Sequence, residues 1–163
     1  MAGTNVVYRV MTVEDIPLVQ LVERKCFTTP WSRNIFVSEV TRNDNAIYIV
    51  AMVGERIVGY AGIWIILDEG HITNIAVDPA FQRQGIGEGL LNVLTQAAVA
   101  RGVIAMTLEV RVSNTGAQAL YSKLGFVPNG IRKQYYQDDK EDALIMWREL
   151  GAEWTSTGNR NEL

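Results

Sequence analysis

Residues 74–89 read NIAVDPAFQRQGIGEG and carry the strongest fold signal in the chain. The first letters have the composition of a buried strand, and an Asp-Pro pair ends it. Gly85, Gly87 and Gly89 then open a segment with helical apolar spacing, although each glycine costs a helix about 1 kcal/mol relative to alanine. Because a helix N-terminus offers unpaired N–H groups and partial positive charge, we predict a loop that binds a pyrophosphate. The alternative is a glycine-softened turn without a ligand.

Two common phosphate-binding motifs do not match this stretch. In the dinucleotide-binding fingerprint the glycines follow the strand almost directly, and an acidic residue about 20 positions further on binds a ribose. Here residues 78–81 separate the strand from the glycines, and the lysine of a nucleotide-binding P-loop does not follow. The phosphate site therefore belongs to another class.

Strand and helix signals alternate around this stretch. We predict an extended segment near residues 8–10, a helix capped by Thr12 that runs to about Cys26, and a second helix capped by Ser32. Three antiparallel strands follow, AIYIVAMV, RIVGYAGIWIIL and HITNIAV, with turns at Gly54-Glu55 and at residues 68–70. A helix to about residue 101 and the strand VIAMTLEV imply a right-handed parallel crossover.

The remaining elements complete an α/β fold with a mixed sheet, in the order β-α-α-β-β-β-α-β-α-β-β. Asn114 is placed to cap another helix that ends at Gly125, and residues 126–136 and 142–150 are predicted to form two closing strands. We expect a single domain at residues 1–150. The polar residues 151–163 are expected to form a loose tail.

The composition of the chain excludes several classes of function. The 163 residues, 48% of them hydrophobic, suit one buried core, and the net charge of −3 provides no basic surface for nucleic acid. Cys26 is the only cysteine, which excludes an intrachain disulfide and a multi-cysteine metal site. The sequence shows neither a secretion signal nor an apolar run near the ~18 residues of a membrane span. We expect a cytoplasmic protein with no nucleic-acid or membrane partner.

From about Tyr8 to Leu150 the chain resembles the GNAT acetyltransferase superfamily. The superfamily hallmark, Gln/Arg-x-x-Gly-x-Gly/Ala, is matched by Gln82, Gly85 and Gly87, with NIAVDP before it and ALYSKLGF after it. In this superfamily the strand before the loop splays from its parallel neighbour and the gap takes the pantetheine arm of acetyl-CoA. The resemblance implies acetyl-CoA as co-substrate. Because the sequence offers no cluster of metal-binding residues, we expect no metal.

The same resemblance implies which residues hold acetyl-CoA. Backbone groups of one strand end would bind the pantetheine, the glycine-rich loop would bind the pyrophosphate, and an asparagine would reach the pantetheine or its neighbourhood. Gln84 departs from many relatives, which have a second arginine there, so one charge beside the pyrophosphate is missing. The implied residues are Ile75, Ala76, Val77, Arg83, Gln84, Gly85, Ile86, Gly87, Glu88 and Asn114.

Within the superfamily, the chain is most similar to the bacterial enzymes that acetylate the N-terminal alanine of a small-subunit ribosomal protein. The matching pieces are PWS at 30–32, LEVRVSN at 108–114, and YY…EDALIM near the end. This implies an N-terminal acetyltransferase whose partner is the N-terminus of a ribosomal or similar basic protein. Acetylation of another peptide, a lysine or a small amine is an alternative, and a non-catalytic acetyl-CoA-binding module is another.

Acetyl transfer to an amine requires a proton acceptor, and Glu109 is the leading candidate. It ends an otherwise apolar strand, where we expect partial desolvation to raise its pKa. The alternative is a solvated strand glutamate or an ion pair with Arg111. Tyr121 is the candidate proton donor to the departing thiolate, with a plain core tyrosine as the alternative. The resemblance supports both roles and assigns the oxyanion to the N–H of Val77.

Aromatic and acidic residues suggest where the acceptor binds. Trp31, Tyr135 and Tyr136 are predicted to line a slot for a peptide N-terminus, although aromatic packing would also account for them. Four carboxylates lie near the same slot and would attract a basic peptide, unless they form a solvated turn. His71, the only histidine, is expected to have a turn or surface role. The four carboxylates belong to Asp138, Asp139, Glu141 and Asp142.

Overall fold

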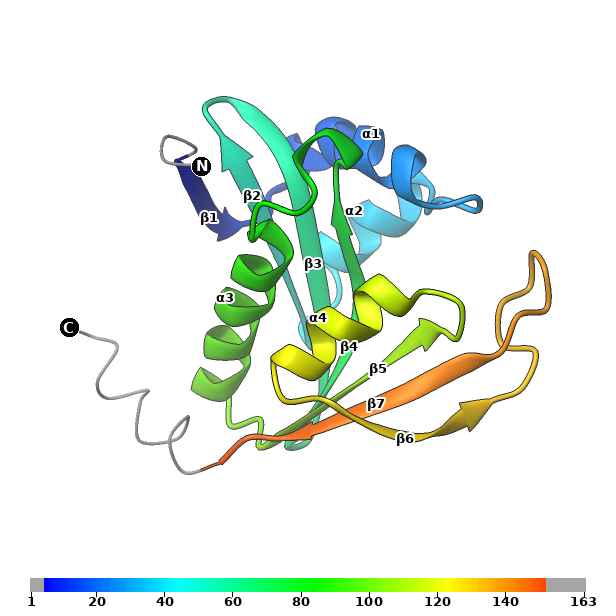
Figure 1. Cartoon of the computed structure of the whole chain (residues 1–163). Coiled ribbons are helices and arrows are strands. Elements are labelled where there is room, and N and C mark those ends of the chain that lie inside the picture. The colour runs from blue at the N-terminus through cyan, green and yellow to red at the C-terminus, as the bar shows by residue number, and fades with distance from the viewer. Residues whose placement is uncertain (1–4, 152–163) are drawn as a thin grey trace. The chain divides into compact units, whose positions relative to one another are not determined.

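The computed structural model describes residues 5–151, which form a mixed α/β fold. Its seven strands follow the hydrogen-bonded order β1-β2-β3-β4-β5-β7-β6 (Figure 1). Backbone contacts group the described residues into two units. The first contains the residues up to Trp64 together with Thr73–Ala97, and the second contains Ile65–Ile72 together with the residues from Ala98 onward. The tail predicted at 151–163 lies outside the described residues, apart from Gly151.

The first unit contains an antiparallel sheet and the helices that precede and follow the glycine-rich loop (residues 82–88) in the sequence. Strand β1 (Val6–Val10) pairs with β2 (Ala46–Val53), and β2 pairs with β3 (Arg56–Ile66), both antiparallel. Buried residues of these strands and the first helices share one apolar core that includes Phe36 and Tyr60. The helices of this unit are α1 (Ile16–Cys26), α2 (Arg33–Thr41) and α3 (Ile86–Ala100), which ends just beyond the unit boundary.

Helix starts in the first unit follow the predicted capping residues. The N–H of Thr12 donates to the carboxylate of Asp15 at 2.8 Å, and a short 3-10 helix (Val13–Asp15) leads into α1. The hydroxyl oxygen of Ser32 accepts the N–H of Ile35 at 3.3 Å and caps α2. Because these caps satisfy donors that the helix leaves unpaired, both predicted starts are confirmed.

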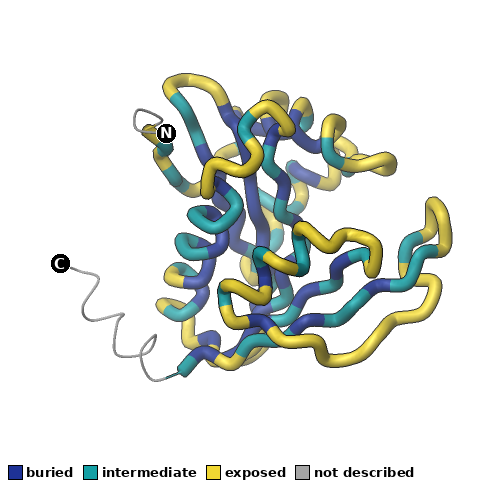
Figure 2. Tube along the Cα trace, viewed as in Figure 1, coloured by how far each residue is buried: buried dark blue, intermediate teal, exposed yellow. Residues whose placement is uncertain are grey.

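Three strands, one helix and the start of β4 (Glu69–Val77) form the second unit. Strand β4 pairs in parallel with β5 (Ala105–Arg111) over only three residue pairs, from Glu69 with Ala105 to His71 with Thr107. Strand β5 is antiparallel to β7 (Ala143–Glu149), which is antiparallel to β6 (Val127–Arg132). Strand β6 is exposed along its whole length (Figure 2). Between β5 and β6 lies α4 (Thr115–Lys123), capped by Asn114 and followed by Gly125 at a φ of 95°.

Several strand boundaries differ from the sequence prediction by one or more residues, and two of the differences move a turn or a loop. The turn after β3 is at Leu67-Asp68 rather than at 68–70, because Leu67 adopts the left-handed conformation with a φ of 57°. The closing hairpin is also shorter: β6 ends at Arg132, and residues 133–142 form a loop instead of continuing the strand to Tyr136. Gln134 turns the chain there with a φ of 52°, and its N–H donates to the carboxylate of Asp142 at 2.9 Å.

Helix length and composition decide whether a helix could cross a membrane. The longest helix among the described residues, α3, has 15 residues. Within residues 5–151, no helix combines the length and apolar character that a membrane crossing needs.

Candidate active site

The glycine-rich loop at residues 82–88 leads into the N-terminus of α3, in the first unit. The side-chain amide of Gln82 donates to the carbonyl oxygen of Val77 at 3.1 Å and so ties the loop to the end of β4. Arg83 and Gly85 both adopt the left-handed conformation, with φ values of 63° and 82°. A Cβ atom built on Gly85 meets no other atom within 4 Å. The loop therefore leaves open space beside backbone at a helix N-terminus, which fits an approaching pyrophosphate.

Gly89 has a different explanation from the one that the sequence suggested. A Cβ atom on Gly89 would collide with the hydroxyl and ring of Tyr8 from β1. The third glycine is therefore required by packing between α3 and β1. Its absence of a side chain does not need a phosphate ligand.

The end of β4 is held by contacts from α1 and β3. The carbonyl oxygen of Val77 accepts the Cys26 thiol at 3.4 Å, and the N–H of Asp78 donates to the carbonyl oxygen of Val58 at 2.8 Å. The buried Asp78 carboxylate accepts from Lys25 at 2.8 Å, which lowers the pKa of that carboxyl. Ala76 is buried in the core. The backbone of residues 75–77 is thus fixed by its surroundings, as a binding edge requires.

Glu109 lies on β5 in the second unit, with its side chain only 8% exposed. Oε1 of Glu109 lies 2.6 Å from Nε2 of His71, and Oε2 lies 3.4 Å from Nε of Arg132. The hydroxyl of Tyr135 is 3.5 Å from the same Oε1. Since a carboxylate only accepts hydrogen bonds, these neighbours present donors to it from three directions.

These donors decide the protonation state of Glu109. Burial raises its pKa, but the hydrogen bond and charge of His71, helped by Arg132 and Tyr135, outweigh burial and lower the pKa below the usual range. The expected upward shift was therefore wrong, because it counted desolvation alone. The alternative ion pair with Arg111 was wrong as well, since the guanidinium of Arg111 pairs with Asp138, Asp139 and Glu141.

His71 was expected to have only a turn or surface role, and instead it contacts the candidate base. In the parallel register His71 pairs with Thr107, and side chains of a strand alternate between faces. Glu109, two residues beyond Thr107, therefore lies on the same face as His71. The period-two pattern was visible in the sequence, but the register that brings His71 and Glu109 together was not.

Tyr121 is buried on α4, as its place in the apolar stripe predicted. Its ring meets Phe126 edge to face with centroids 6.0 Å apart. Burial, and to a smaller extent nearby Tyr136, raise the pKa of the Tyr121 phenol. The phenol is thus neutral at physiological pH and can donate a hydrogen bond, while its role as proton donor stays a prediction.

The predicted acceptor residues fall in both units. Trp31 belongs to the first unit, where it packs edge to face on Phe36, with ring centroids 5.4 Å apart, and on Tyr48. Tyr135 and Tyr136 belong to the second unit, with ring centroids 5.1 Å apart. Aromatic packing therefore explains part of the environment of Trp31. Tyr135, beside Glu109, is 41% exposed.

A buried carboxylate that the sequence did not single out as functional anchors the Trp31 loop. Glu23 on α1 is 2% exposed and accepts the N–H of Trp31 at 2.8 Å. It also accepts the hydroxyl of Tyr60, which in turn accepts from the amide of Asn74 at 3.4 Å. Burial raises the pKa of Glu23 despite these donors. The sequence signal that could have revealed Glu23 is a single acidic residue on the buried face of an amphipathic helix.

Asn114 is placed as a helix cap. Its side-chain oxygen accepts the N–H of Ala117 at 3.1 Å, which confirms the capping prediction. This bond uses one acceptor site of the amide and leaves its two N–H donors for other partners. Its contact with a pantetheine stays a prediction.

Comparison with known proteins agrees with the fold. Residues 16–126, more than half of the chain, match the Acetyltransferase (GNAT) family. A Bacillus subtilis protein named "putative ribosomal protein bS18-alanine N-acetyltransferase" is 44% identical over 144 residues, covering 88% of this chain and 95% of that protein. The ribosomal protein bS18-alanine N-acetyltransferase of Salmonella typhimurium is 37% identical over 139 residues, covering 84% and 93%.

A solved structure shows the same architecture. The crystal structure of the ribosomal-protein-S18-alanine N-acetyltransferase from Escherichia coli has a TM-score of 0.82 and 35% identity, and the match covers 90% of this chain and 95% of that one. Fold and sequence together define an acyl-transferring enzyme. The chain belongs to the GNAT acetyltransferase family.

Proposed function

We propose that this protein transfers an acetyl group from acetyl-CoA to the N-terminal alanine of a small-subunit ribosomal protein. The observation that carries the proposal is the setting of Glu109, a largely buried carboxylate kept ionised by His71 and bordered by the exposed ring of Tyr135. The relatives named above supply the substrate class, because they are named for bS18 alanine acetylation and align along nearly their whole length.

The residues of the first unit are assigned to acetyl-CoA. The loop at 82–88 would hold the pyrophosphate on N–H groups of the α3 N-terminus, and the backbone of residues 75–77 would hold the pantetheine. Bound there, acetyl-CoA supplies the thioester whose acetyl group is transferred. The N–H of Val77 would stabilise the oxyanion that forms during transfer.

Glu109 takes the proton that the acceptor amine loses. An α-ammonium group has a pKa of about 8, so a minority of the acceptor is neutral at pH 7 and can attack. Once the new N–C bond forms, the nitrogen proton becomes strongly acidic, and even a carboxylate of low pKa accepts it. Tyr121 is the proposed proton donor to the departing thiolate: its neutral phenol would donate a hydrogen bond to the sulfur as the C–S bond breaks, while burial disfavours a free phenolate.

Trp31, Tyr135 and Tyr136 would contact the first residues of the acceptor peptide. We expect aromatic side chains around the acceptor to favour a small first residue by steric exclusion, since a larger one would keep the amine from the thioester carbon.

The proposal is tested with an alanine-initiated ribosomal peptide that also contains an internal lysine. Mass spectrometry should place the acetyl group on the N-terminus. Glu109→Gln should lower turnover by about 10²- to 10⁴-fold, because only proton acceptance is lost, and higher pH should restore part of the rate. Acetyl-CoA binding, measured by the shift in melting temperature, should survive in that variant. Acetylation at lysine only, or an unchanged rate in Glu109→Gln, would remove the proposal.

A further inference from the structure

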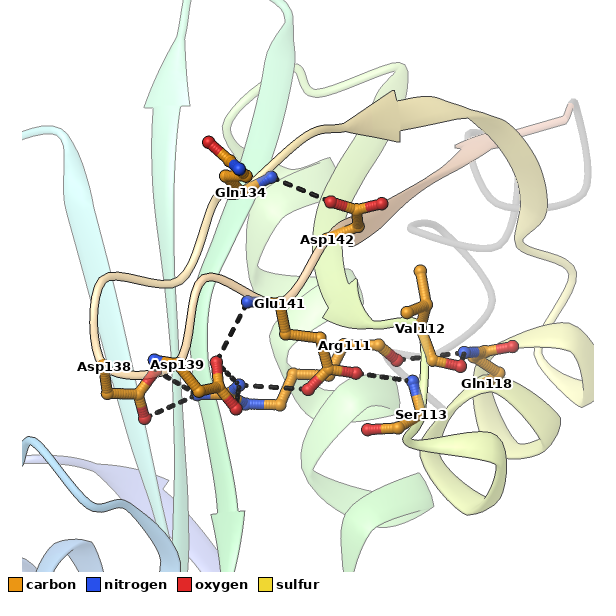
Figure 3. Close-up of polar contacts among 9 residues, drawn as sticks. All are labelled: Arg111, Val112, Ser113, Gln118, Gln134, Asp138, Asp139, Glu141 and Asp142. Carbon is orange, nitrogen blue, oxygen red and sulfur yellow. Dashed lines mark hydrogen bonds and ion pairs between the residues drawn. The ribbon is translucent and has the colours of Figure 1, made fainter.

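The loop at residues 133–142 is held by one side chain from β5. Nη2 of Arg111 contacts both carboxylate oxygens of Asp138 at 2.9 Å, and Nη1 contacts those of Asp139 at 2.9 and 3.0 Å and Glu141 at 3.1 Å. Figure 3 shows the guanidinium enclosed by these three acids. Its carbon also lies 4.0 Å from the ring centroid of Tyr136. We call Arg111, Tyr136, Asp138, Asp139 and Glu141 the Arg111 clamp.

Hydrogen bonds hold the backbone of Arg111, from which the clamp extends. Arg111 is the last residue of β5 and pairs with Ala143, the first residue of β7. Its carbonyl oxygen accepts the side-chain amide of Gln118 at 3.0 Å (Figure 3). The same oxygen accepts the N–H of Asn114 at 2.9 Å. The guanidinium thus projects into the loop from backbone that two other elements of the second unit hold in place.

The acids of the loop are engaged within the loop and by Arg111. Glu141 accepts the N–H of Ser113 at 2.8 Å, and Asp139 accepts the N–H of Glu141 at 3.0 Å. Asp142, the fourth acid, pairs with Lys133 at 3.3 Å. The acidic patch that was expected either to attract a basic peptide or to be solvated is therefore largely satisfied internally. Its main effect is to order the loop.

A chain of contacts leads from the clamp to the candidate base. Tyr136, stacked on the guanidinium, meets the ring of Tyr135 at 5.1 Å, and the hydroxyl of Tyr135 lies 3.5 Å from Glu109. A planar guanidinium can stack on a ring and bind carboxylates in its plane at the same time, whereas the ammonium of lysine cannot do both. Moving Tyr136 would therefore move Tyr135 relative to Glu109.

We propose that Arg111 is a positioning residue for the acceptor: by clamping the 133–142 loop onto Tyr136, it fixes Tyr135 beside Glu109 and so sets the affinity for the acceptor peptide. The proposal rests on the proposed function, because it assumes that the acceptor amine is delivered to Glu109. Arg111 acts through Tyr136 and is itself committed to protein carboxylates. Its loss should weaken acceptor binding more than it slows the chemical step.

The test compares Arg111→Lys, which keeps the charge, with Lys133→Gln, which removes a cation from the same loop outside the clamp. In Arg111→Lys the KM for an alanine-initiated peptide should rise about tenfold or more, while kcat changes less than about threefold. Hydrogen exchange at residues 133–142 should accelerate, and the melting-temperature shift produced by acetyl-CoA should stay at its wild-type size. Lys133→Gln should match the wild type in all four measurements.

A double-mutant cycle separates positioning from general loss of stability. If Arg111 acts through Tyr136, the KM effect of Arg111→Lys should be small in a Tyr136→Leu background, because the coupled partner is already gone. Additive effects, or a fall in kcat with KM unchanged, would overturn the proposal.

Hydrogen exchange also separates this proposal from the proposed function. A wild-type protein that leaves the peptide unmodified refutes the proposed function and, with it, the role in acceptor binding. Faster exchange at residues 133–142 in Arg111→Lys would then still establish the clamp as a structural device. If the wild type acetylates the peptide but Arg111→Lys shows unchanged KM and unchanged exchange, only the Arg111 proposal fails.

Discussion

At the scale of single residues, Glu109 shows how hydrogen-bond donors reverse the effect of burial. Desolvation is the largest single influence on this carboxyl and favours its neutral form, yet His71, Arg132 and Tyr135 together lower its pKa. The lowered pKa means that this group stabilises the folded state above its ordinary pKa, and that the contribution is lost as the pH falls through the lowered value. Glu109 therefore stays ionised across the whole neutral range.

Removing His71 should make the ionisation of Glu109 visible in the kinetics. In His71→Leu the burial of Glu109 remains while its best hydrogen-bond donor is lost, so the pKa of Glu109 should rise. As the pH is lowered, kcat/KM should therefore begin to fall at a higher pH in this variant than in the wild type. The measurement is kcat/KM for the alanine peptide between pH 5 and 9 at saturating acetyl-CoA. His71→Gln, which keeps a neutral N–H donor, should give an acid limb between the two. Coinciding acid limbs in all three proteins would show that His71 does not tune the base.

At the scale of elements, the local signals were reliable and the long-range ones were not. Strand β2 and the caps at Thr12, Ser32 and Asn114 were predicted correctly, because apolar alternation and capping depend on neighbours within a few residues. The 133–142 loop was predicted as strand up to Tyr136. Its shape depends on Arg111, a residue more than 20 positions away, which no local pattern reveals.

The same limit applies to the candidate site. The positions of Glu109 and Tyr121 on a strand and on a buried helix face were predictable from periodicity. The partner of Glu109 was not, since it depends on the register between β4 and β5. The glycine loop was recognisable as a unit, but only the close approach of Tyr8 separates the packing role of Gly89 from a ligand role.

Substitutions should therefore distinguish the packing role of Gly89 from the ligand-binding role predicted for Gly87. Gly89→Ala should lower the free energy of unfolding by about 1–3 kcal/mol, because its Cβ meets Tyr8. The protein that does fold should keep its response to acetyl-CoA. Saturation at one hundred times Kd should still add about 2.7 kcal/mol, or roughly 5–10 °C in melting temperature.

Gly87→Val is the contrasting variant, since its side chain would block the pyrophosphate from the helix N-terminus. It should abolish the acetyl-CoA shift. Tyr8→Leu should relieve the cost of Gly89→Ala and serves as the matched control. Loss of the shift in Gly89→Ala, or its retention in Gly87→Val, would contradict this division of roles.

At the scale of the whole molecule, the chain matches its curated relatives along nearly their full length, so the resemblance is not confined to the cofactor loop. With the loop acids engaged by Arg111 and Lys133, we infer that selection rests on the shape of the first residues more than on peptide charge.

The central claim is that the acceptor is a free N-terminal alanine, and competition between amines tests it most directly. The enzyme receives acetyl-CoA and equal concentrations of three acceptors: an alanine-initiated ribosomal peptide, the same peptide with a blocked N-terminus and a free internal lysine, and a polyamine. Mass spectrometry follows the early rate of acetylation of each. We predict that the free alanine peptide is acetylated at least about a hundredfold faster than either competitor, as expected for a site that positions one amine. Equal rates for the blocked peptide or the polyamine would contradict the claim.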